Sequence, residues 1–207
     1  MPGRGHRTRP GGPLIGEHMD LELNTMLVAL MFVTILSMGI GNILVTLADV
    51  FNHATRSRRS GVHVAWIVLL LLVHFNLFWE TKELINREVW RFGDFLLVIA
   101  GPVLLFFATN VLLTDPSERE SVDLERFFVG LGRRFFLMLV AVQVWTLVVA
   151  FTLIGGLSSS DTFNIALGVL PLFLMLKTAH RIQVAGVVVA WVLALLSMVF
   201  RGAGLIS

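Results

Sequence analysis

Residues 95–114, "FLLVIAGPVLLFFATNVLLT", contain no aspartate, glutamate, lysine or arginine. A helix needs about 20 apolar residues to cross the hydrocarbon core of a bilayer, and this run reaches that length. A backbone in lipid must satisfy its own hydrogen bonds, so the segment is either a helix or a strand of a closed barrel. Barrel strands alternate apolar and polar residues, whereas this run is continuously apolar. The stretch therefore predicts a transmembrane helix.

Similar runs recur along the chain and predict further spans. Charged residues make up 14% of the sequence, compared with about 25% in soluble domains. The run at 162–176 is short for a span. We expect an all-α fold, an integral membrane bundle of six transmembrane helices in contact with the lipid bilayer. The predicted spans are about 26–48, 62–79, 95–114, 135–155, 162–176 and 184–201.

The spans form a single predicted domain at 25–203. Residues 1–24 begin with a Gly-, Pro- and Arg-rich stretch that is typical of disorder, and residues 204–207 form a short C-terminal tail. The initiating methionine could be Met1 or Met19, and the sequence leaves both open.

Two loops have helical patterns of their own. In the loop 79–94, Trp79 and Trp90 suit the membrane–water boundary, which favours a short helix lying in the outer interface. In the loop 115–134, Ser117 and Glu120 form a capping box that predicts a charged helix. We expect one or two short interfacial helices, with their charges solvated in preference to forming a binding site.

Lysine and arginine near the span ends indicate orientation. The loops after the first, third and fifth spans carry nine of these residues, against four near the other span ends. Positive charge favours the cytoplasmic side. We therefore expect both termini to lie outside the cytoplasm.

Few polar residues occur within the predicted spans, and His74 is the strongest functional candidate among them. A polar group in lipid is costly, so it usually faces the bundle interior and often marks a pathway. His74 could titrate or contact a solute. It could equally join two helices by a hydrogen bond. The sequence leaves these two interpretations about equal.

Four amide side chains lie in other spans or beside His74. They are Asn42, Asn76, Asn110 and Gln143. Each one alone is more often an interhelical hydrogen-bonding group than a ligand. Together with His74 they predict a polar cavity within the membrane.

Two prolines and two sets of small residues bear on helix geometry. Pro102 and Pro171 lie inside predicted spans, where proline removes a backbone donor and kinks the helix. Small residues spaced four apart let helices approach closely, either within the chain or between copies. These small residues are Ser37 and Gly41 in the first span, and Gly186 and Ala190 in the sixth.

The sequence carries no recognisable catalytic motif and no cysteine. The histidines are too scattered for one chain to hold a metal or a haem, so we expect no cofactor. A haem shared between His74 residues of two copies stays open. The modest net charge of +2 comes largely from loop arginines and does not indicate nucleic-acid binding.

The segment 74–116 resembles a group of small, uncharacterised bacterial multi-pass membrane proteins. The resemblance rests on a His-Phe-x-x-aromatic-Trp stretch and on a later Pro-containing span that ends near Asp-Pro. In this chain these are His74, Phe75, Phe78 and Trp79, then Trp90, Phe92, Pro102, Asp115 and Pro116. The resemblance implies a bacterial inner membrane location and attaches no activity or cofactor.

Function is an expectation at this point. The leading hypothesis is a small-solute or ion transporter or channel, oligomeric, with its cavity around His74. The alternative is a non-catalytic membrane subunit or sensor that packs against partner membrane proteins, in a homo-oligomer or a larger complex. A hydrated cavity favours the first hypothesis and a dry interior favours the second.

Overall fold

The computed structural model describes residues 15–52, 61–85, 90–113, 124–154, 161–176 and 180–202. These residues form helices and contain no strand. The helices are α1 (Ile15–Asn52), α2 (Gly61–Ile85), α3 (Phe92–Leu113), α4 (Leu124–Val149), α5 (Asp161–Leu176) and α6 (His180–Gly202). A π-helical turn, η2 (Ala150–Ile154), follows α4 directly.

Five helices contain segments long and apolar enough to cross a membrane. These segments are Leu23–Asn52, Gly61–Trp79, Phe92–Leu113, Gly132–Leu153 and Arg181–Val199. The apolar segment of α5 is shorter, and all 16 residues of α5 would reach only about 24 Å at 1.5 Å per residue. The core of a bilayer measures about 30 Å. The all-helical prediction is thus confirmed, together with five apolar helices long enough to cross a membrane, whereas the sixth span stays a prediction.

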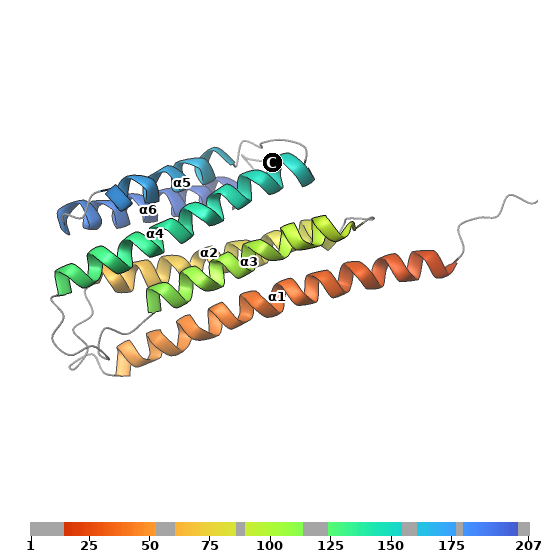
Figure 1. Ribbon diagram of the computed structural model, residues 1–207, viewed down its shortest axis with the longest axis horizontal. Coiled ribbons are helices and arrows are strands. Elements are labelled where there is room, and N and C mark those ends of the chain that lie inside the picture. The colour runs from red at the N-terminus through yellow and green to blue at the C-terminus, as the bar shows by residue number, and fades with distance from the viewer. Residues whose placement is uncertain are drawn as a thin grey trace, which may run out of the picture.

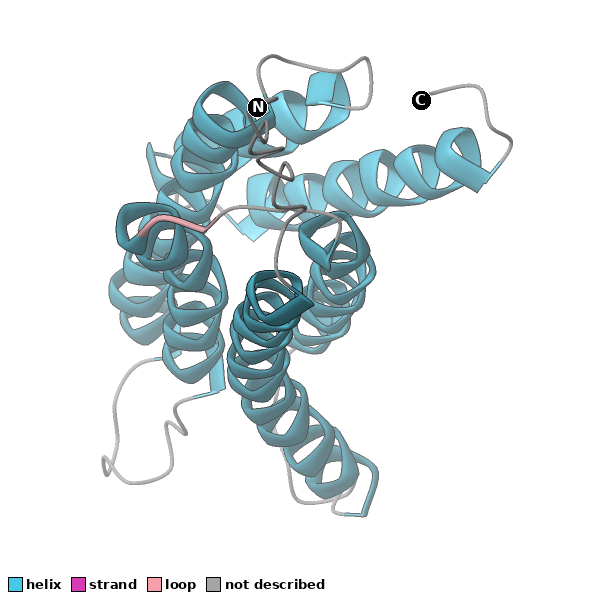
Figure 2. Cartoon of the chain, turned by 90° about the vertical axis from the view of Figure 1, so that its right-hand side faces the viewer, coloured by secondary structure: helices cyan, strands magenta, loops and turns pink. Residues whose placement is uncertain are grey.

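The helices lie side by side, and consecutive helices run in opposite directions (Figure 1). The first turn of α1 and the last turn of α6 therefore lie at the same end of the bundle. The packing neighbours form a closed circuit in the order α1, α3, α4, α5, α6, α2 and back to α1. A smaller contact between α2 and α3 crosses this circuit, and the end-on view shows the helices grouped around one another (Figure 2). Helix α2 thus contacts α1 and α3 on one side of the bundle and α6 on the other.

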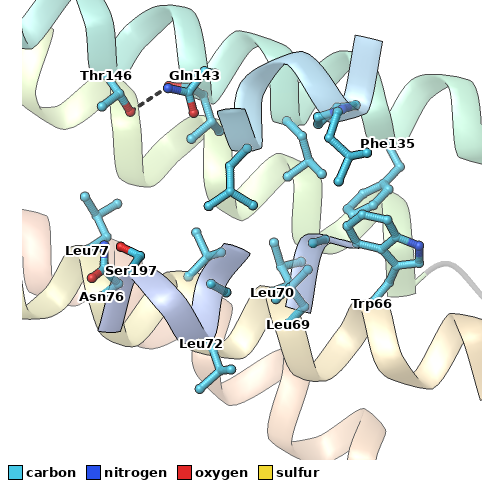
Figure 3. Close-up of a pocket in the computed structure, with 18 of the residues that line it drawn as sticks. Trp66, Leu69, Leu70, Leu72, Asn76, Leu77, Phe135, Gln143, Thr146 and Ser197 are labelled. Carbon is cyan, nitrogen blue, oxygen red and sulfur yellow. Dashed lines mark hydrogen bonds between the residues drawn. The ribbon is translucent and has the colours of Figure 1, made fainter. Parts of the chain in front are cut away.

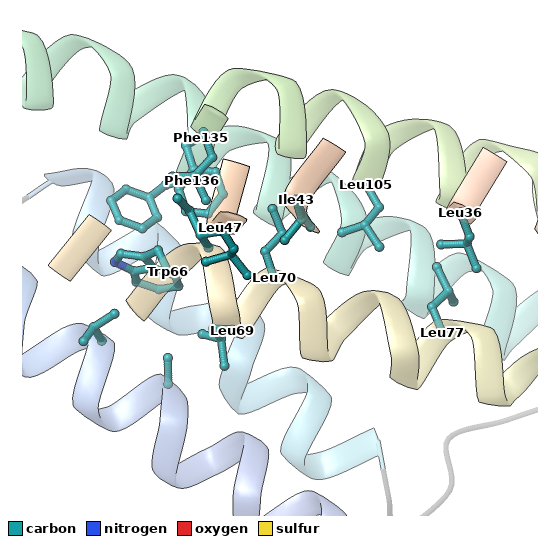
Figure 4. Packing of buried hydrophobic residues seen from close by; sticks show 14 of the residues in the cluster. Leu36, Ile43, Leu47, Trp66, Leu69, Leu70, Leu77, Leu105, Phe135 and Phe136 are labelled. Atoms are coloured by element: carbon teal, nitrogen blue, oxygen red, sulfur yellow. The ribbon is translucent and has the colours of Figure 1, made fainter. Parts of the chain in front are cut away.

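Large apolar side chains in the core pack the helices against one another. Leu36 and Ile43 of α1 and Leu105 of α3 are 0% exposed (Figure 4). The ring of Trp66 in α2 meets Phe135 and Phe136 of α4 edge-on, with centroids 5.6 and 5.4 Å apart. Such pairs contribute about 0.5–1.5 kcal/mol beyond their buried area. Many other apolar side chains, such as Phe51 at 77% exposure, face outward, as a surface in lipid allows.

Helices α1 and α2 extend beyond the predicted boundaries. Helix α1 begins at Ile15, within the stretch 1–24 expected to be disordered, and residues 1–14 lie outside the described part. Helix α2 continues past Trp79 to Ile85, because no glycine or proline interrupts it there. Extending a helix adds one hydrogen bond for each residue ordered, which favours continuation.

The predicted interfacial helices are not separate elements among the described residues. The start of the loop 79–94 belongs to the end of α2, and its last residues belong to the start of α3. Helix α4 begins at Leu124 and runs directly into the fourth apolar segment. Residues 86–89 and 114–123, including the predicted capping box, lie outside the described residues.

Candidate functional site

His74 lies at a junction of three helices. Its side chain is 0% exposed. The atom Nδ1 lies 2.8 Å from the carbonyl oxygen of Leu70, and since a carbonyl only accepts, Nδ1 must carry the donated proton. In the neutral ring Nε2 is then an acceptor, and it lies 3.4 Å from the hydroxyl oxygen of Thr109 in α3. That hydroxyl lies closer to the carbonyl oxygen of Leu105, at 2.9 Å.

The third helix of the junction contributes Gly39. A Cβ atom at this position in α1 would lie 2.4 Å from Nε2 of His74, far inside van der Waals contact. Only glycine lets α1 approach the imidazole this closely. We call Gly39, His74 and Thr109 the His74 junction. The polar atoms of His74 and Thr109 face each other between α2 and α3, and α1 packs against the imidazole at Gly39, so the geometry supports a role for His74 in joining helices.

The junction also bears on the shared haem. A haem iron bound by two copies needs an imidazole nitrogen at the surface of each. Here Nδ1 faces its own helix and Nε2 faces Gly39 and Thr109. This arrangement does not fit such a group.

A cavity of about 150 Å³ lies between α2, α4, α5 and α6 (Figure 3). Most of its lining is hydrocarbon or aromatic, and none of the described residues that line it is charged. Four lining residues carry polar side chains: Asn76, Gln143, Thr146 and Ser197. We call this space the α2–α6 cavity. Mostly apolar walls with a few polar groups are typical of small-molecule sites.

The side chain of Gln143 forms part of the wall of the α2–α6 cavity, where a glycine of α5 leaves room for it. A Cβ atom at Gly168 would lie 2.1 Å from Cγ of Gln143, so the side chain lies directly against the α5 backbone. The amide nitrogen Nε2 is buried and has no hydrogen-bond partner in the part of the chain that the structure describes. The neighbouring hydroxyl of Thr146 lies 3.1 Å from the carbonyl oxygen of Val142, to which it donates. Buried donors are rarely left unpaired, so Nε2 indicates a place for an acceptor.

The α5 wall of the cavity also contains a proline, which interrupts the backbone hydrogen bonding of the helix. Pro171 lines the cavity and has no backbone N–H, which leaves the carbonyl of Leu167, one turn earlier, without its helical donor. Leu167 also lines the cavity. Pro102 lies inside α3 and is buried, and it is not a lining residue. Both helices continue through their prolines.

The five polar residues proposed from the sequence do not meet in one place. Asn76 and Gln143 line the α2–α6 cavity. His74 is on the same helix as Asn76 and is not a lining residue. Asn42 and Asn110 are exposed, and the Asn110 amide donates to the carbonyl of Phe106 at 2.9 Å.

The small residues of the first and sixth helices lie in different surroundings. A Cβ atom at Gly186 would lie 2.4 Å from the Leu174 side chain, and Ala190 is 1% exposed, so both allow close packing of α6 within the chain. Ser37 and Gly41 are exposed, and a Cβ atom at Gly41 would meet nothing within 4 Å. A contact of this second pair with another copy stays a prediction.

Sequence reasoning missed the residues that hold the polar side chains in place. Gly39 and Gly168 are distant in sequence from His74 and Gln143, the side chains that pack against them. These contacts become apparent only when it is known which helices pack together. Gly101 is similar, since a Cβ atom there would lie 2.3 Å from the ring of Trp145. The available signal was a glycine inside an apolar run, which indicates a close helix approach and does not identify the partner.

Among the described residues, no group of three histidine, aspartate or glutamate side chains could hold a metal ion. No protein-family model, curated protein or solved structure matches the chain.

Proposed function

We propose that the protein is a small-solute transporter or channel of the bacterial inner membrane, and that the solute occupies the α2–α6 cavity. One observation carries this proposal: a cavity of about 150 Å³ at membrane depth holds Asn76 and a buried, unpaired Gln143 nitrogen in otherwise apolar walls. A helix bundle with a purely structural role would gain stability if side chains filled this space. A transporter must keep the space free of side chains so that a solute can enter.

The proposal assigns different roles to the polar residues. Asn76 and Gln143 contact the solute. Pro171 weakens the backbone hydrogen bonding of α5 beside the cavity, which favours opening at that wall. His74 joins α2 to α1 and α3 and gives α2 a fixed support. Its protonation would change the donor pattern of the junction, so His74 is the candidate for pH control of flux.

Solute flux in proteoliposomes tests the proposal. A broad panel of small solutes and ions is compared between wild type, Gln143→Leu and Gly132→Ala. We expect Gln143→Leu to lose flux of at least one solute while it remains folded, and Gly132→Ala to keep it. His74→Ala should make that flux insensitive to pH. Absence of flux for every solute in wild type would refute transport.

The proposed topology has six spans with both termini outside, in an oligomer. The start of α1 and the end of α6 lie at the same end of the bundle, which supports an even number of membrane crossings. Because the chain has no cysteine, single cysteines at Ser60 and Ser207 can be labelled separately in intact cells. An impermeant thiol reagent should modify Ser207→Cys and leave Ser60→Cys unmodified. The reverse result would invert the topology, and labelling of both would make the span count odd.

The alternative function is that of a membrane subunit or sensor that binds partner proteins. The exposed Ser37 and Gly41 on α1 favour it, because a small-residue face that is free within the chain can receive another helix. Substituting both by leucine would then disrupt an assembly seen by size-exclusion chromatography and would leave solute binding intact.

A further inference from the structure

We infer that the α2–α6 cavity selects an uncharged small molecule with an apolar body and a hydrogen-bond acceptor, and that Gln143 recognises the acceptor. This inference rests on the proposed function for its link to transport and concerns the ligand class alone. Its support comes from the lining chemistry, the unpaired donor and the size of the cavity.

The lining argues against an ion. None of the described lining residues is charged, and an unpaired charge in an apolar site costs many kcal/mol unless it is neutralised. A cation would need several oxygen ligands, as Ca²⁺ and Mg²⁺ do. The side chains of Asn76, Thr146 and Ser197 are too few among the apolar ones to replace a hydration shell.

The unpaired nitrogen argues for an acceptor on the ligand. The amide of Gln143 has two N–H groups, and Nε2 has no partner among the described residues. The indole nitrogen of Trp66 also has none, but Trp66 lies at the other end of the lining from Gln143 (Figure 3). The adjacent Thr146 hydroxyl could receive at most one of them, so at least one N–H is available. A site built to hydrogen-bond a ligand rejects the analogue that lacks the bonding atom, because the buried group is then left unpaired.

The volume limits the size of the ligand. A volume of about 150 Å³ is several times the roughly 30 Å³ share of one water molecule. Cavities of about this volume admit benzene. The expected ligand is therefore about the size of a six-membered ring. The aromatic side chains of Trp66 and Phe135 at one end of the lining suit a flat or apolar body (Figure 3).

Three probes of nearly equal shape separate these features: fluorobenzene, 3-fluoropyridine and N-methyl-3-fluoropyridinium. The first has no good acceptor, the second adds a ring nitrogen that accepts, and the third carries a positive charge. Binding is measured by ¹⁹F NMR with the full chain in lipid nanodiscs, and affinities are corrected for partition into empty nanodiscs.

We expect wild type to bind 3-fluoropyridine about fivefold more tightly than fluorobenzene, as one net hydrogen bond of about 1 kcal/mol predicts. Binding of the cation should be undetectable. Gln143→Leu should abolish the preference and keep binding of fluorobenzene. Ala194→Leu, which fills the cavity wall, should lose both neutral probes. Gly132→Ala, whose Cβ atom would make only an ordinary contact of 3.7 Å with Phe136, should behave as wild type.

Three results would overturn the inference. They are a preference that survives in Gln143→Leu, binding of the cation as tight as that of 3-fluoropyridine, and no saturable binding of either neutral probe. These outcomes are separable from those for transport. Selective binding without flux of any solute would refute the proposed function alone, whereas ion flux without probe binding would refute the inferred ligand class alone.

Discussion

The His74 junction and the α2–α6 cavity share helix α2 and differ in how their polar atoms are satisfied. At the junction, both imidazole nitrogens have partners or neighbours within the chain, and the side chain is 0% exposed. In the cavity, the amide nitrogen of Gln143 is buried without a partner among the described residues. Burial of a polar group therefore does not by itself indicate a ligand site. The proposed ligand site rests instead on the unpaired donor together with the empty volume beside it.

The largest expected difference between the two regions comes from added volume. Ala108 of α3 precedes Thr109 of the His74 junction and is 0% exposed, whereas Ala194 of α6 lines the cavity. Ala108→Leu should lower the free energy of unfolding by about 1–3 kcal/mol or more, because a packed site must distort. Ala194→Leu should be neutral or should stabilise by about 0.5–2 kcal/mol, as cavity filling does. Unfolding in mixed micelles measures both, and equal losses would contradict the distinction between the two regions.

The second expected effect is at Gly39. Gly39→Ala places a Cβ atom against Nε2 of His74, whose side chain is 0% exposed. We expect a loss of about 1–3 kcal/mol. Gly41→Ala, two residues along the same helix, meets nothing within 4 Å and is the matched control. The double variant Gly39→Ala/His74→Ala should lose less than the sum of the single variants, and strict additivity would mean that the contact does not matter.

A smaller loss of stability is expected at Gly168. Gly168→Ala displaces Gln143, and the displaced side chain can move into the cavity. The loss should therefore be below about 1 kcal/mol, less than overpacking usually costs. The preference for 3-fluoropyridine should nevertheless disappear. Gly132→Ala is the control, because its Cβ atom makes only an ordinary contact of 3.7 Å with Phe136. A stability loss equal to that of Gly39→Ala would indicate that the cavity wall is as tightly packed as the junction.

The smallest effect is expected from Thr109→Val. This change keeps the side-chain shape and removes the hydroxyl that lies 3.4 Å from Nε2 of His74. Interhelical hydrogen bonds in membranes contribute about 0.6 kcal/mol on average. Thermal unfolding should therefore shift only slightly, with solute flux unchanged. Loss of flux with unchanged stability would instead place His74 on the solute path.

The apolar runs were sufficient to predict an all-helical fold with helices of membrane-crossing length, because length and the absence of charge define such a segment directly. They predicted the apolar segments of α2 and α3 to within a few residues. The start of α1 at Ile15 was missed, because composition near the terminus suggested disorder. The residues of the cavity wall were predicted in part, since Asn76 and Gln143 stand out as polar groups. Their separation from His74, Asn42 and Asn110 depends on which helices pack together and which face each helix turns inward. Neither can be read from the residues next to these positions in the sequence.

The most direct test of the central claim is thiol accessibility at one position in each region. Ser197→Cys lies in the α2–α6 cavity and Thr109→Cys in the His74 junction, and the chain has no cysteine of its own. Both variants are treated in proteoliposomes with the small, uncharged reagent methyl methanethiosulfonate. We predict that Ser197→Cys reacts, that 3-fluoropyridine slows this reaction, and that Thr109→Cys stays unmodified. Reaction of Thr109→Cys as fast as that of Ser197→Cys, or no reaction at Ser197→Cys, would contradict a solute site in the cavity.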